Sequence, residues 1–294
     1  MSSNIHIFTH NDLDGIGCLQ TFIWCFPEAN ITYTTISSSS EFNKEYYKAN
    51  KKKEIDSYDK VFVTDLSLLE QDLNLIDKKN VIFIDHHKTS LNFKFVNAAN
   101  FTKLFSSCTL LVYKLFKSSL DINNYQKNLL ILIDDYDSYR LSFSNTKNLN
   151  TLFWAHYYNN VPLFLSDFHD GFIKFDSLQN KIINIQNQKT IETIKNLKPF
   201  YTKTKIQNIE CSIIAAFADT AINDVSDYLL QQHSADISIV VNLKSDRVSF
   251  RRKNTAIDLS LLAKKLCDGG GHEAAAGGKI TEIFLEFTKI FSET

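Results

Sequence analysis

Seven histidine and aspartate side chains with the chemistry of metal ligands follow the ends of short apolar runs. They lie in the segments HNDLDG, VTD and IDHH and are His10, Asp12, Asp14, Asp65, Asp85, His86 and His87. Carboxylates and imidazoles without sulfur suit Mn²⁺, Mg²⁺ or a related divalent ion. Two such ions about 3.5–4 Å apart catalyse in-line displacement at phosphorus. Acids two residues apart in the sequence can each reach one ion, and a separate acid can bridge the two. A single Asp after a strand is more commonly a helix N-cap, as we expect of Asp72 and Asp258, but the whole set predicts a metal centre.

A second candidate segment lies near the C-terminal end, where three glycines precede a histidine. Seven of the eight glycines fall in HNDLDGIG and GGGHEAAAGG, and three of the four arginines fall within residues 247–252. A helix starting after GGGH would make the backbone N–H groups of Gly270 and Gly271 an anion site. Arg251 and His272 would add donors, since a guanidinium binds phosphate through two parallel hydrogen bonds. The alternative is that these glycines form only a tight turn.

Parallel strands are the elements that must position the first set. Residues 5–9, 60–64 and 81–84 are short β-branched or aromatic runs, and each leads into the acids named above. Helical patterns over 15–26 and 68–79 separate them, and further helices are expected over 107–118, 124–135 and 149–158. This alternation predicts a parallel sheet covered on both faces. The ligand crevice of such a sheet lies at the carboxyl ends of its strands, where these side chains would emerge.

The second half of the chain predicts a connecting helix and a smaller α/β domain. A polar stretch lies between Pro162 and Pro199, and its isoleucine spacing indicates a helix within 175–197. Strands are expected over 211–216, 237–241 and 247–251, and helices over 258–266 and 283–291. We therefore expect an α/β protein with a catalytic domain over 1–168, a helical linker over 169–200 and a substrate-binding domain over 201–294.

Composition argues against several classes of protein. The 294 residues are 44% hydrophobic and 22% charged with a formal net charge of −1, which fits a globular protein and argues against stable binding of duplex DNA. No apolar run approaches the roughly 18 residues that cross a membrane, and the N-terminal sequence lacks the features of a signal peptide. The five cysteines are scattered without a CxxC pair, which predicts reduced thiols and a cytoplasmic location.

Four motifs in order make the sequence similar to a known family. HNDLDG, VTDLS, IDHHKT and IDDYDSY resemble motifs I to IV of the DHH phosphoesterases, named for Asp85-His86-His87. The strand around Arg251 and the segment GGGHEAAAG resemble the DHH-associated C-terminal domain, so the resemblance runs from about residue 5 to residue 280. It implies a parallel-sheet catalytic domain, a helical linker and a smaller α/β domain, with substrate held in the cleft between the domains.

The resemblance also implies a role for each matching residue. His10 and Asp12 would hold one Mn²⁺ ion, Asp14 and His86 a second, and Asp65 would bridge them, with Mg²⁺ or Co²⁺ as substitutes. Motif IV supplies one more ligand from Asp134, Asp135 or Asp137, and the D-S-Y context favours Asp137. Asp85 would orient an imidazole, and His87 would face the scissile phosphate. Motif I has its histidine two residues before Asp12, whereas several branches of the family place it four before.

The function implied is that of a nano-RNase, which hydrolyses very short oligoribonucleotides to mononucleotides and also 3′-phosphoadenosine 5′-phosphate. The near-neutral charge and the two core domains without an added OB-fold favour this branch, because a long-strand nuclease needs a basic groove with stacking aromatics. The alternatives are a phosphodiesterase for cyclic or linear signalling dinucleotides, a single-strand DNA exonuclease, and an idle nucleotide sensor, against which the full ligand set argues. The partners expected are short RNA oligonucleotides or dinucleotides, without a membrane, and a homodimer is left open.

Overall fold

The computed structural model describes residues 2–253 and 255–291. The chain divides into two compact units, Met1–Ile183 and Asn184–Thr294. Helix α9 (Ser177–Lys195) begins in the first unit and ends in the second. It lies within the segment that was expected to link two domains.

The first unit is built on a five-stranded parallel sheet with the strand order β2-β1-β3-β4-β5. Its strands are β1 (Asn4–His10), β2 (Asn30–Ile36), β3 (Lys60–Thr64), β4 (Val81–Ile84) and β5 (Ala99–Asn100). Its helices are α1 (Leu13–Cys25), α2 (Ser39–Lys51), α3 (Glu54–Ser57), α4 (Leu73–Ile76), α5 (Cys108–Phe116), α6 (Asn124–Asp137), α7 (Ser144–Leu152) and α8 (Val161–Asp167). A π-helical turn, Phe153–Tyr157, continues α7.

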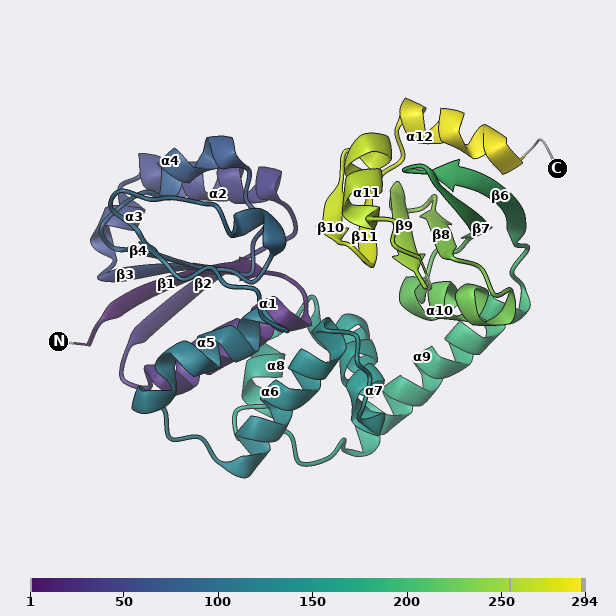
Figure 1. The fold of residues 1–294 in the computed structure, drawn as a ribbon. Coiled ribbons are helices and arrows are strands. Elements are labelled where there is room, and N and C mark those ends of the chain that lie inside the picture. The colour runs from purple at the N-terminus through teal and green to yellow at the C-terminus, as the bar shows by residue number, and fades with distance from the viewer. Residues whose placement is uncertain (1, 254, 292–294) are drawn as a thin grey trace. The chain divides into compact units, whose positions relative to one another are not determined.

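Alternating side chains of the strands fill two cores, one on each face of the sheet. Ile5 and Ile7 of β1 pack toward α1, α5 and α6, whereas Phe8 packs on the opposite face with Phe42 of α2. Figure 1 shows α2 on one side of this sheet and α1 and α5 on the other. The period-2 alternation of a strand explains why one run of apolar residues supplies both cores.

The three strands expected to carry acids are confirmed, and two elements differ from expectation. Strand β2 is not among the predicted strands; its residues NITYTTI are mostly only partly buried because β2 is an edge strand. The helix expected over 68–79 is reduced to a 3-10 turn, Glu70–Asp72, and the short α4. Asp72 precedes α4 without a side-chain capping bond, whereas Asp258 caps its helix by accepting from two backbone N–H groups.

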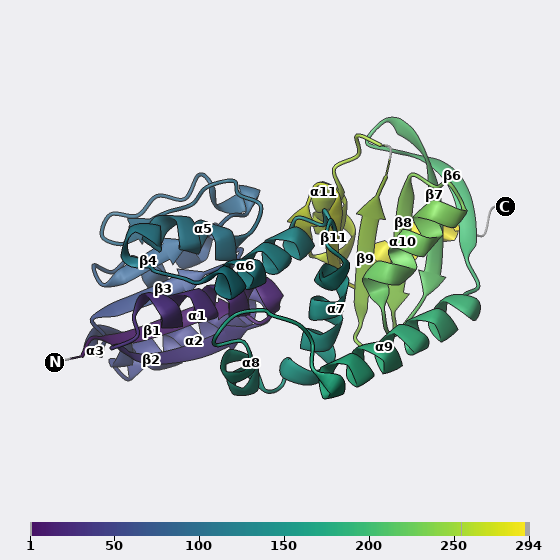
Figure 2. The same cartoon turned by 90° about the horizontal axis from the view of Figure 1, so that it is seen from below.

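The second unit is also an α/β structure, but its six-stranded sheet is mixed, in the order β10-β11-β9-β8-β7-β6. Only β7 and β8 pair in parallel among these strands. The strands are β6 (Phe200–Ile206), β7 (Ile209–Phe217), β8 (Ile237–Asn242), β9 (Arg247–Arg252), β10 (Gly270–His272) and β11 (Ala275–Lys279), and the helices are α10 (Ile222–Gln232), α11 (Leu259–Cys267) and α12 (Glu282–Phe287). Figure 2 shows α10 lying across β8 and β9. The α/β fold class predicted from the sequence is therefore confirmed.

The glycine-rich segment is a β-hairpin, so the expectation that a helix starts after GGGH is wrong. Strand β11 lies between β10 and β9, and α11 packs over it. A Cβ atom at Gly277 would lie 2.6 Å from the Val248 carbonyl oxygen, and one at Gly278 would lie 2.3 Å from that of Cys267. The small residues after GGGH therefore allow a strand to pack closely between two neighbours, and they do not begin a helix.

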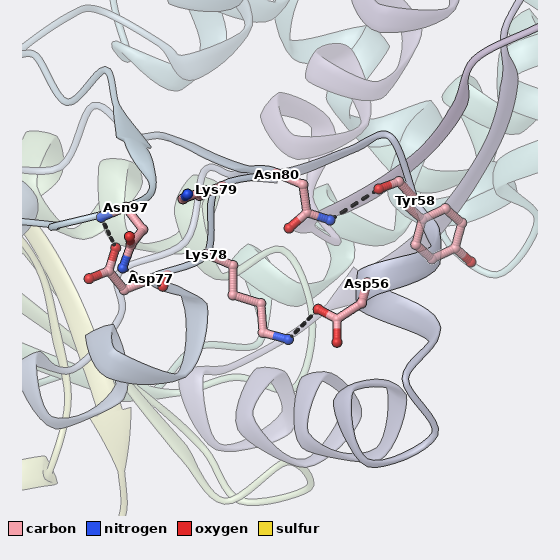
Figure 3. Close-up of a pocket in the computed structure, with 7 residues that line it drawn as sticks. All are labelled: Asp56, Tyr58, Asp77, Lys78, Lys79, Asn80 and Asn97. Carbon is pink, nitrogen blue, oxygen red and sulfur yellow. Dashed lines mark hydrogen bonds and ion pairs between the residues drawn. The ribbon is translucent and has the colours of Figure 1, made fainter.

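Two further features bear on function. No helix in residues 2–253 and 255–291 is long and apolar enough to cross a membrane. A polar pocket lies at the amino ends of β3 and β4, opposite to the ends from which the predicted acids emerge (Figure 3). Its groups pair with one another, as Lys78 does with Asp56, and it contains none of the predicted site residues.

Candidate metal centre

The predicted site residues of the first unit emerge at the carboxyl ends of three adjacent strands, except Asp137, which is the last residue of α6. Strand β1 ends in His10 and the loop to α1, β3 leads into Asp65, and β4 leads into Asp85-His86-His87. Because β1, β3 and β4 are neighbours in a parallel sheet, their loops meet at one edge. The sheet order therefore brings segments more than 70 residues apart in the sequence to one place.

These residues form two adjoining groups of possible ligand atoms. One nitrogen or oxygen from each of His10, Asp12 and Asp65 lies within 4.8 Å of the other two, and the same holds for Asp14, His86 and Asp137. All six residues that the sequence predicts as metal ligands are thus brought together. Their role as ligands stays a prediction.

His86 connects the two groups. Its Nδ1 lies 3.3 Å from the Phe105 carbonyl oxygen, which can only accept a hydrogen bond, so Nδ1 is the donor. Its Nε2 lies 3.4 Å from Asp65 Oδ1, and the distances to carboxylate oxygens of Asp137 and Asp14 are 3.6 and 3.7 Å. In the neutral ring, the Phe105 carbonyl therefore fixes the tautomer whose unprotonated Nε2 faces three carboxylates.

Asp14 is held by the first turn of a neighbouring helix. Its two carboxylate oxygens accept from the backbone N–H groups of Cys108 (2.7 Å) and Thr109 (2.9 Å) at the start of α5. Helix N-termini stabilise negative charge in this way. Gly17 allows the contact between α1 and α5, because a Cβ atom there would lie 2.3 Å from the Thr109 hydroxyl oxygen. The sequence shows none of these backbone donors.

Asp65 combines burial with an unusual backbone. Its φ is 56°, in the left-handed region that non-glycine residues seldom occupy. Its side chain is 3% exposed, and its Oδ2 has no hydrogen-bond partner among the residues that the structure describes. Among the described residues, the Oδ2 atoms of Asp85 and Asp137 are also buried without a hydrogen-bond partner. Strained backbone and unpaired buried oxygens are typical of ligand and catalytic sites.

The electrostatics of the cluster show an excess of negative charge. Burial first, and then repulsion from Asp14 and Asp12, raises the pKa of Asp65 well above its usual range. Burial and the charge of Asp14 do the same to the pKa of Asp137. Burial opposes the ionisation of His86, but Asp14 and Asp137 overcome it and raise the pKa of this imidazole. The residues present therefore fit bound divalent cations, which would relieve the repulsion and pair the buried oxygens.

Asp85 and His87 form a separate pair beside the cluster. His87 Nδ1 lies 2.7 Å from Asp85 Oδ1, and Asp85 is fully buried. Burial opposes ionisation of Asp85, but the charge and hydrogen bond of His87 lower the pKa of this carboxyl. The imidazole that Asp85 contacts is thus that of His87, and the contact fixes the ring of a residue that was predicted to face the scissile phosphate.

Hydrogen bonds distinguish the three acids of motif IV. Asp134 accepts from Ser107 Oγ at 2.8 Å and pairs with Arg140. Asp135 accepts from the Ser142 N–H at 2.8 Å and the Thr146 hydroxyl at 2.6 Å. Both carboxylates thus hold neighbouring backbone and side chains in place. Asp137 remains as the acid that lies within the cluster, as its sequence context favoured.

The predicted substrate residues of the second unit lie on neighbouring strands. Arg251 on β9 is paired in register with Ala275 on β11, which is paired with His272 on β10. Opposed residues of neighbouring antiparallel strands project to the same face, so Arg251 and His272 share one face. Arg251 Nη2 donates to Asn223 Oδ1 of α10 at 2.6 Å, a partner that sequence reasoning missed because no spacing pattern links the two residues.

Gly270 and Gly271 lie on the exposed edge strand of the same sheet. Gly270 has open space around the position of a Cβ atom. Gly271 has a φ of 135°, which strains any other residue. Only Gly271 of the pair therefore has a conformational reason to be glycine.

Comparison with known proteins supports the resemblance. The DHHA1 domain family matches residues 210–293. Oligoribonuclease NrnB of Bacillus subtilis (strain 168) is 26% identical over 308 residues, which cover 96% of this chain and 74% of the relative.

Solved structures share the fold. The DHH domain of a member of a family of ribosomal proteins aligns with a TM-score of 0.62 at 11% identity, covering 99% of this chain and 86% of that one. Exonuclease RecJ bound to manganese aligns with a TM-score of 0.57 at 11% identity, covering 99% and 90%. An exopolyphosphatase-related protein from Bacteroides fragilis gives 0.55 at 16% identity, covering 99% and 91%. The resemblance inferred from the four motifs is thus confirmed: the C-terminal family match and the oligoribonuclease relative support a DHH-family phosphoesterase, and the solved structures show a shared fold.

Proposed function

We propose that this DHH phosphoesterase is a metal-dependent nano-RNase that hydrolyses very short oligoribonucleotides to mononucleotides, and also hydrolyses 3′-phosphoadenosine 5′-phosphate. The observation that carries the proposal is the pair of adjoining ligand groups in which His86 Nε2 faces three carboxylates. The oligoribonuclease relative, which aligns along nearly the whole chain, supports the choice of RNA.

The chain offers ligands for two divalent ions. His10 and Asp12 would hold one ion, Asp14, His86 and Asp137 the other, and Asp65 would contribute to both. When bound, two such ions supply Lewis acidity to the phosphoryl oxygens and lower the pKa of an attacking water. Mn²⁺ suits this mixture of imidazole and carboxylate better than Mg²⁺, which prefers an all-oxygen octahedron.

The remaining pair of the first unit, Asp85 and His87, would act on the substrate through His87. His87, oriented by Asp85, would donate a hydrogen bond to a phosphoryl oxygen or a proton to the leaving oxygen. Fixing the imidazole in advance avoids the cost of orienting it at the moment of reaction. The fully buried Asp85 would accept from His87 Nδ1–H and stabilise the doubly protonated ring, whose Nε2–H is the group that would donate to the substrate.

The second unit would recognise the end of the substrate that is remote from the scissile bond. Arg251 carries a guanidinium that can clamp a phosphate, and Asn223 orients that group. Gly270, Gly271 and His272 on the exposed edge strand would add backbone and imidazole donors. Such contacts would give short substrates the binding energy that places the scissile phosphate.

A length series tests this function. Purified protein with Mn²⁺ is offered 5′-labelled RNAs of two, five and twenty-four nucleotides, beside 3′-phosphoadenosine 5′-phosphate and cyclic dinucleotides. The proposal predicts the fastest cleavage of the two-nucleotide RNA and loss of cleavage in EDTA. A preference for the 24-nucleotide RNA would indicate a processive exonuclease, and a preference for cyclic dinucleotides would indicate a signalling phosphodiesterase. Either preference contradicts the nano-RNase assignment.

A further inference from the structure

A pair of neighbouring aromatic side chains in the first unit is connected to the candidate metal centre through one hydrogen bond. The Trp154 and Tyr158 rings have centroids 4.6 Å apart with an interplanar angle of 32°. Trp154 is 48% exposed, although tryptophan buries more apolar surface than other side chains when it is covered. Phe153, which is fully buried, supports the indole edge to face at 5.7 Å. The contact with Phe153 thus holds Trp154 against the core, and part of the indole surface is exposed to solvent.

A hydrogen bond ties this pair to the segment that carries two predicted ligands. Asn11 Nδ2 donates to the Tyr158 hydroxyl at 2.9 Å. Asn11 lies between His10 and Asp12, and its backbone N–H donates to the Ile36 carbonyl at 3.0 Å. Asn11 therefore connects Tyr158 to the two predicted ligands that flank it in the sequence, and its backbone hydrogen bond to Ile36, the last residue of β2, fixes its position.

The backbone that carries the pair is itself unusual. Residues Phe153–Tyr157 form a π-helical turn between α7 and α8. Such turns are rare and are frequently found at functional sites. The exposed indole and the rare helical turn, which Tyr158 connects to the loop after β1, are two observations that indicate a ligand with a flat apolar face.

We propose that Trp154, backed by Tyr158, is a stacking platform for the nucleobase of the nucleotide that adjoins the scissile phosphate. The inference rests on the proposed function, because it takes a short RNA as the substrate. Stacking on an aromatic face accepts every base, since each base has a π-face. The platform would therefore require a base without selecting its identity, as an enzyme that degrades mixed short RNAs needs.

Tryptophan fluorescence can detect this contact without any turnover. The chain has two tryptophans, Trp24 and Trp154, so Trp24→Phe leaves Trp154 as the single reporter. Adenosine 5′-monophosphate is offered with Mg²⁺, because a product of the reaction is not consumed, and ribose 5-phosphate serves as the ligand without a base. We expect saturable quenching by the nucleotide and none by the sugar phosphate. The matched variant Trp154→Phe retains Trp24, whose indole N–H donates to the His169 carbonyl, and should show no saturable quenching.

Calorimetry with a second variant measures the strength of the contact. Trp154→Ala should bind adenosine 5′-monophosphate roughly 5- to 150-fold more weakly than the wild type, whereas Trp154→Phe should recover most of the loss because it keeps an aromatic face. Both variants should leave the affinity for ribose 5-phosphate within twofold of the wild type. Their melting temperatures are recorded, so that a lost fold is not mistaken for a lost platform.

The outcomes separate this inference from the proposed function. Unchanged nucleotide affinity in Trp154→Ala, or equal quenching by nucleotide and sugar phosphate, would overturn the platform even if the wild type cleaves short RNA. Quenching by the nucleotide together with failure to cleave any short RNA would refute the proposed function and leave the platform standing. A change of oligomeric state in Trp154→Ala without a change in nucleotide affinity would make the aromatic pair a protein contact, which also overturns the inference.

Discussion

Replacing Asp65 by asparagine should make the metal-free protein more stable and at the same time weaken its response to metal. Asp65 is buried in contact range of other carboxylates, and its Oδ2 has no hydrogen-bond partner among the described residues. Asparagine has nearly the same shape and tolerates the left-handed backbone found at Asp65, where φ is 56°. Alanine would add about 1 kcal/mol of backbone strain and obscure the electrostatic effect.

The magnitude follows from the distances in the cluster. Two carboxylate oxygens 4.8 Å apart, the limit within each group, repel by about 3 kcal/mol at an effective dielectric constant near 20. Attraction between Asp65 and His86, whose Nε2 lies 3.4 Å from Oδ1, offsets part of this repulsion. We therefore expect Asp65→Asn to raise the free energy of unfolding in EDTA at pH 8 by about 1–3 kcal/mol, or the melting temperature by roughly 2–10 °C.

Thermal denaturation with and without Mn²⁺ tests both parts of this prediction. Ligand binding stabilises the wild type in proportion to RT ln(1 + [L]/Kd), so the wild type should gain several degrees from Mn²⁺ and the variant should gain much less. Hydrolysis of a dinucleotide by the variant should fall to less than a tenth of the wild-type rate. A variant that is less stable than the wild type in EDTA, or that gains equally from Mn²⁺, would show that Asp65 does not lie in an electrostatically crowded metal centre.

Three further predictions follow from other parts of the structure. Asp137→Asn should reduce the Mn²⁺ affinity measured by calorimetry at least tenfold. Asp135→Asn should leave that affinity unchanged and lower the free energy of unfolding by about 1–2 kcal/mol, because Asp135 accepts from Ser142 and Thr146. Equal effects of the two changes on Mn²⁺ affinity would refute the choice of Asp137 as the ligand. Arg251→Ala should cost about 2–4 kcal/mol in kcat/KM for dinucleotides and little for bis-p-nitrophenyl phosphate, and equal losses on both would place Arg251 in catalysis or folding. Burial lowers the pKa of His6 to about 4, so the folded protein resists protonation of His6. The free energy of unfolding should therefore fall by up to about 3 kcal/mol as the pH falls from about 6.5 to about 4. The same pH dependence in denaturant series of His6→Gln would contradict this.

The sequence predicted the strands that carry the site because their burial leaves a clear pattern. Strands β1, β3 and β4 are nearly continuous apolar runs, as expected of strands covered on both faces. Strand β2 was missed because its threonines and partial exposure at the sheet edge give no such run. The GGGH segment was assigned to a helix start because small residues do not reveal which neighbouring strand they pack against, and only the register with β9 settles that.

The candidate site was predicted in its residues but not in its supports. Because these residues follow the carboxyl ends of predicted parallel strands, the sequence implied that His10, Asp65 and His86 would converge, and they do. The sequence alone did not show which of the three motif IV acids is the ligand, because the hydrogen bonds that Asp134 and Asp135 accept come from residues on other turns and loops. The left-handed backbone of Asp65 and the carbonyl that orients His86 depend on tertiary contacts, which no local pattern records.

Anomalous X-ray diffraction from crystals grown with Mn²⁺ would show directly whether the two ligand groups bind metal. We expect two manganese peaks, one between His10, Asp12 and Asp65 and the other between Asp14, His86 and Asp137, with the Asp65 carboxylate in contact with both. Asp137→Asn crystals should lose or weaken the second peak and retain the first. Absence of manganese from both groups, or a single peak elsewhere in the chain, would show that these residues do not form a metal centre.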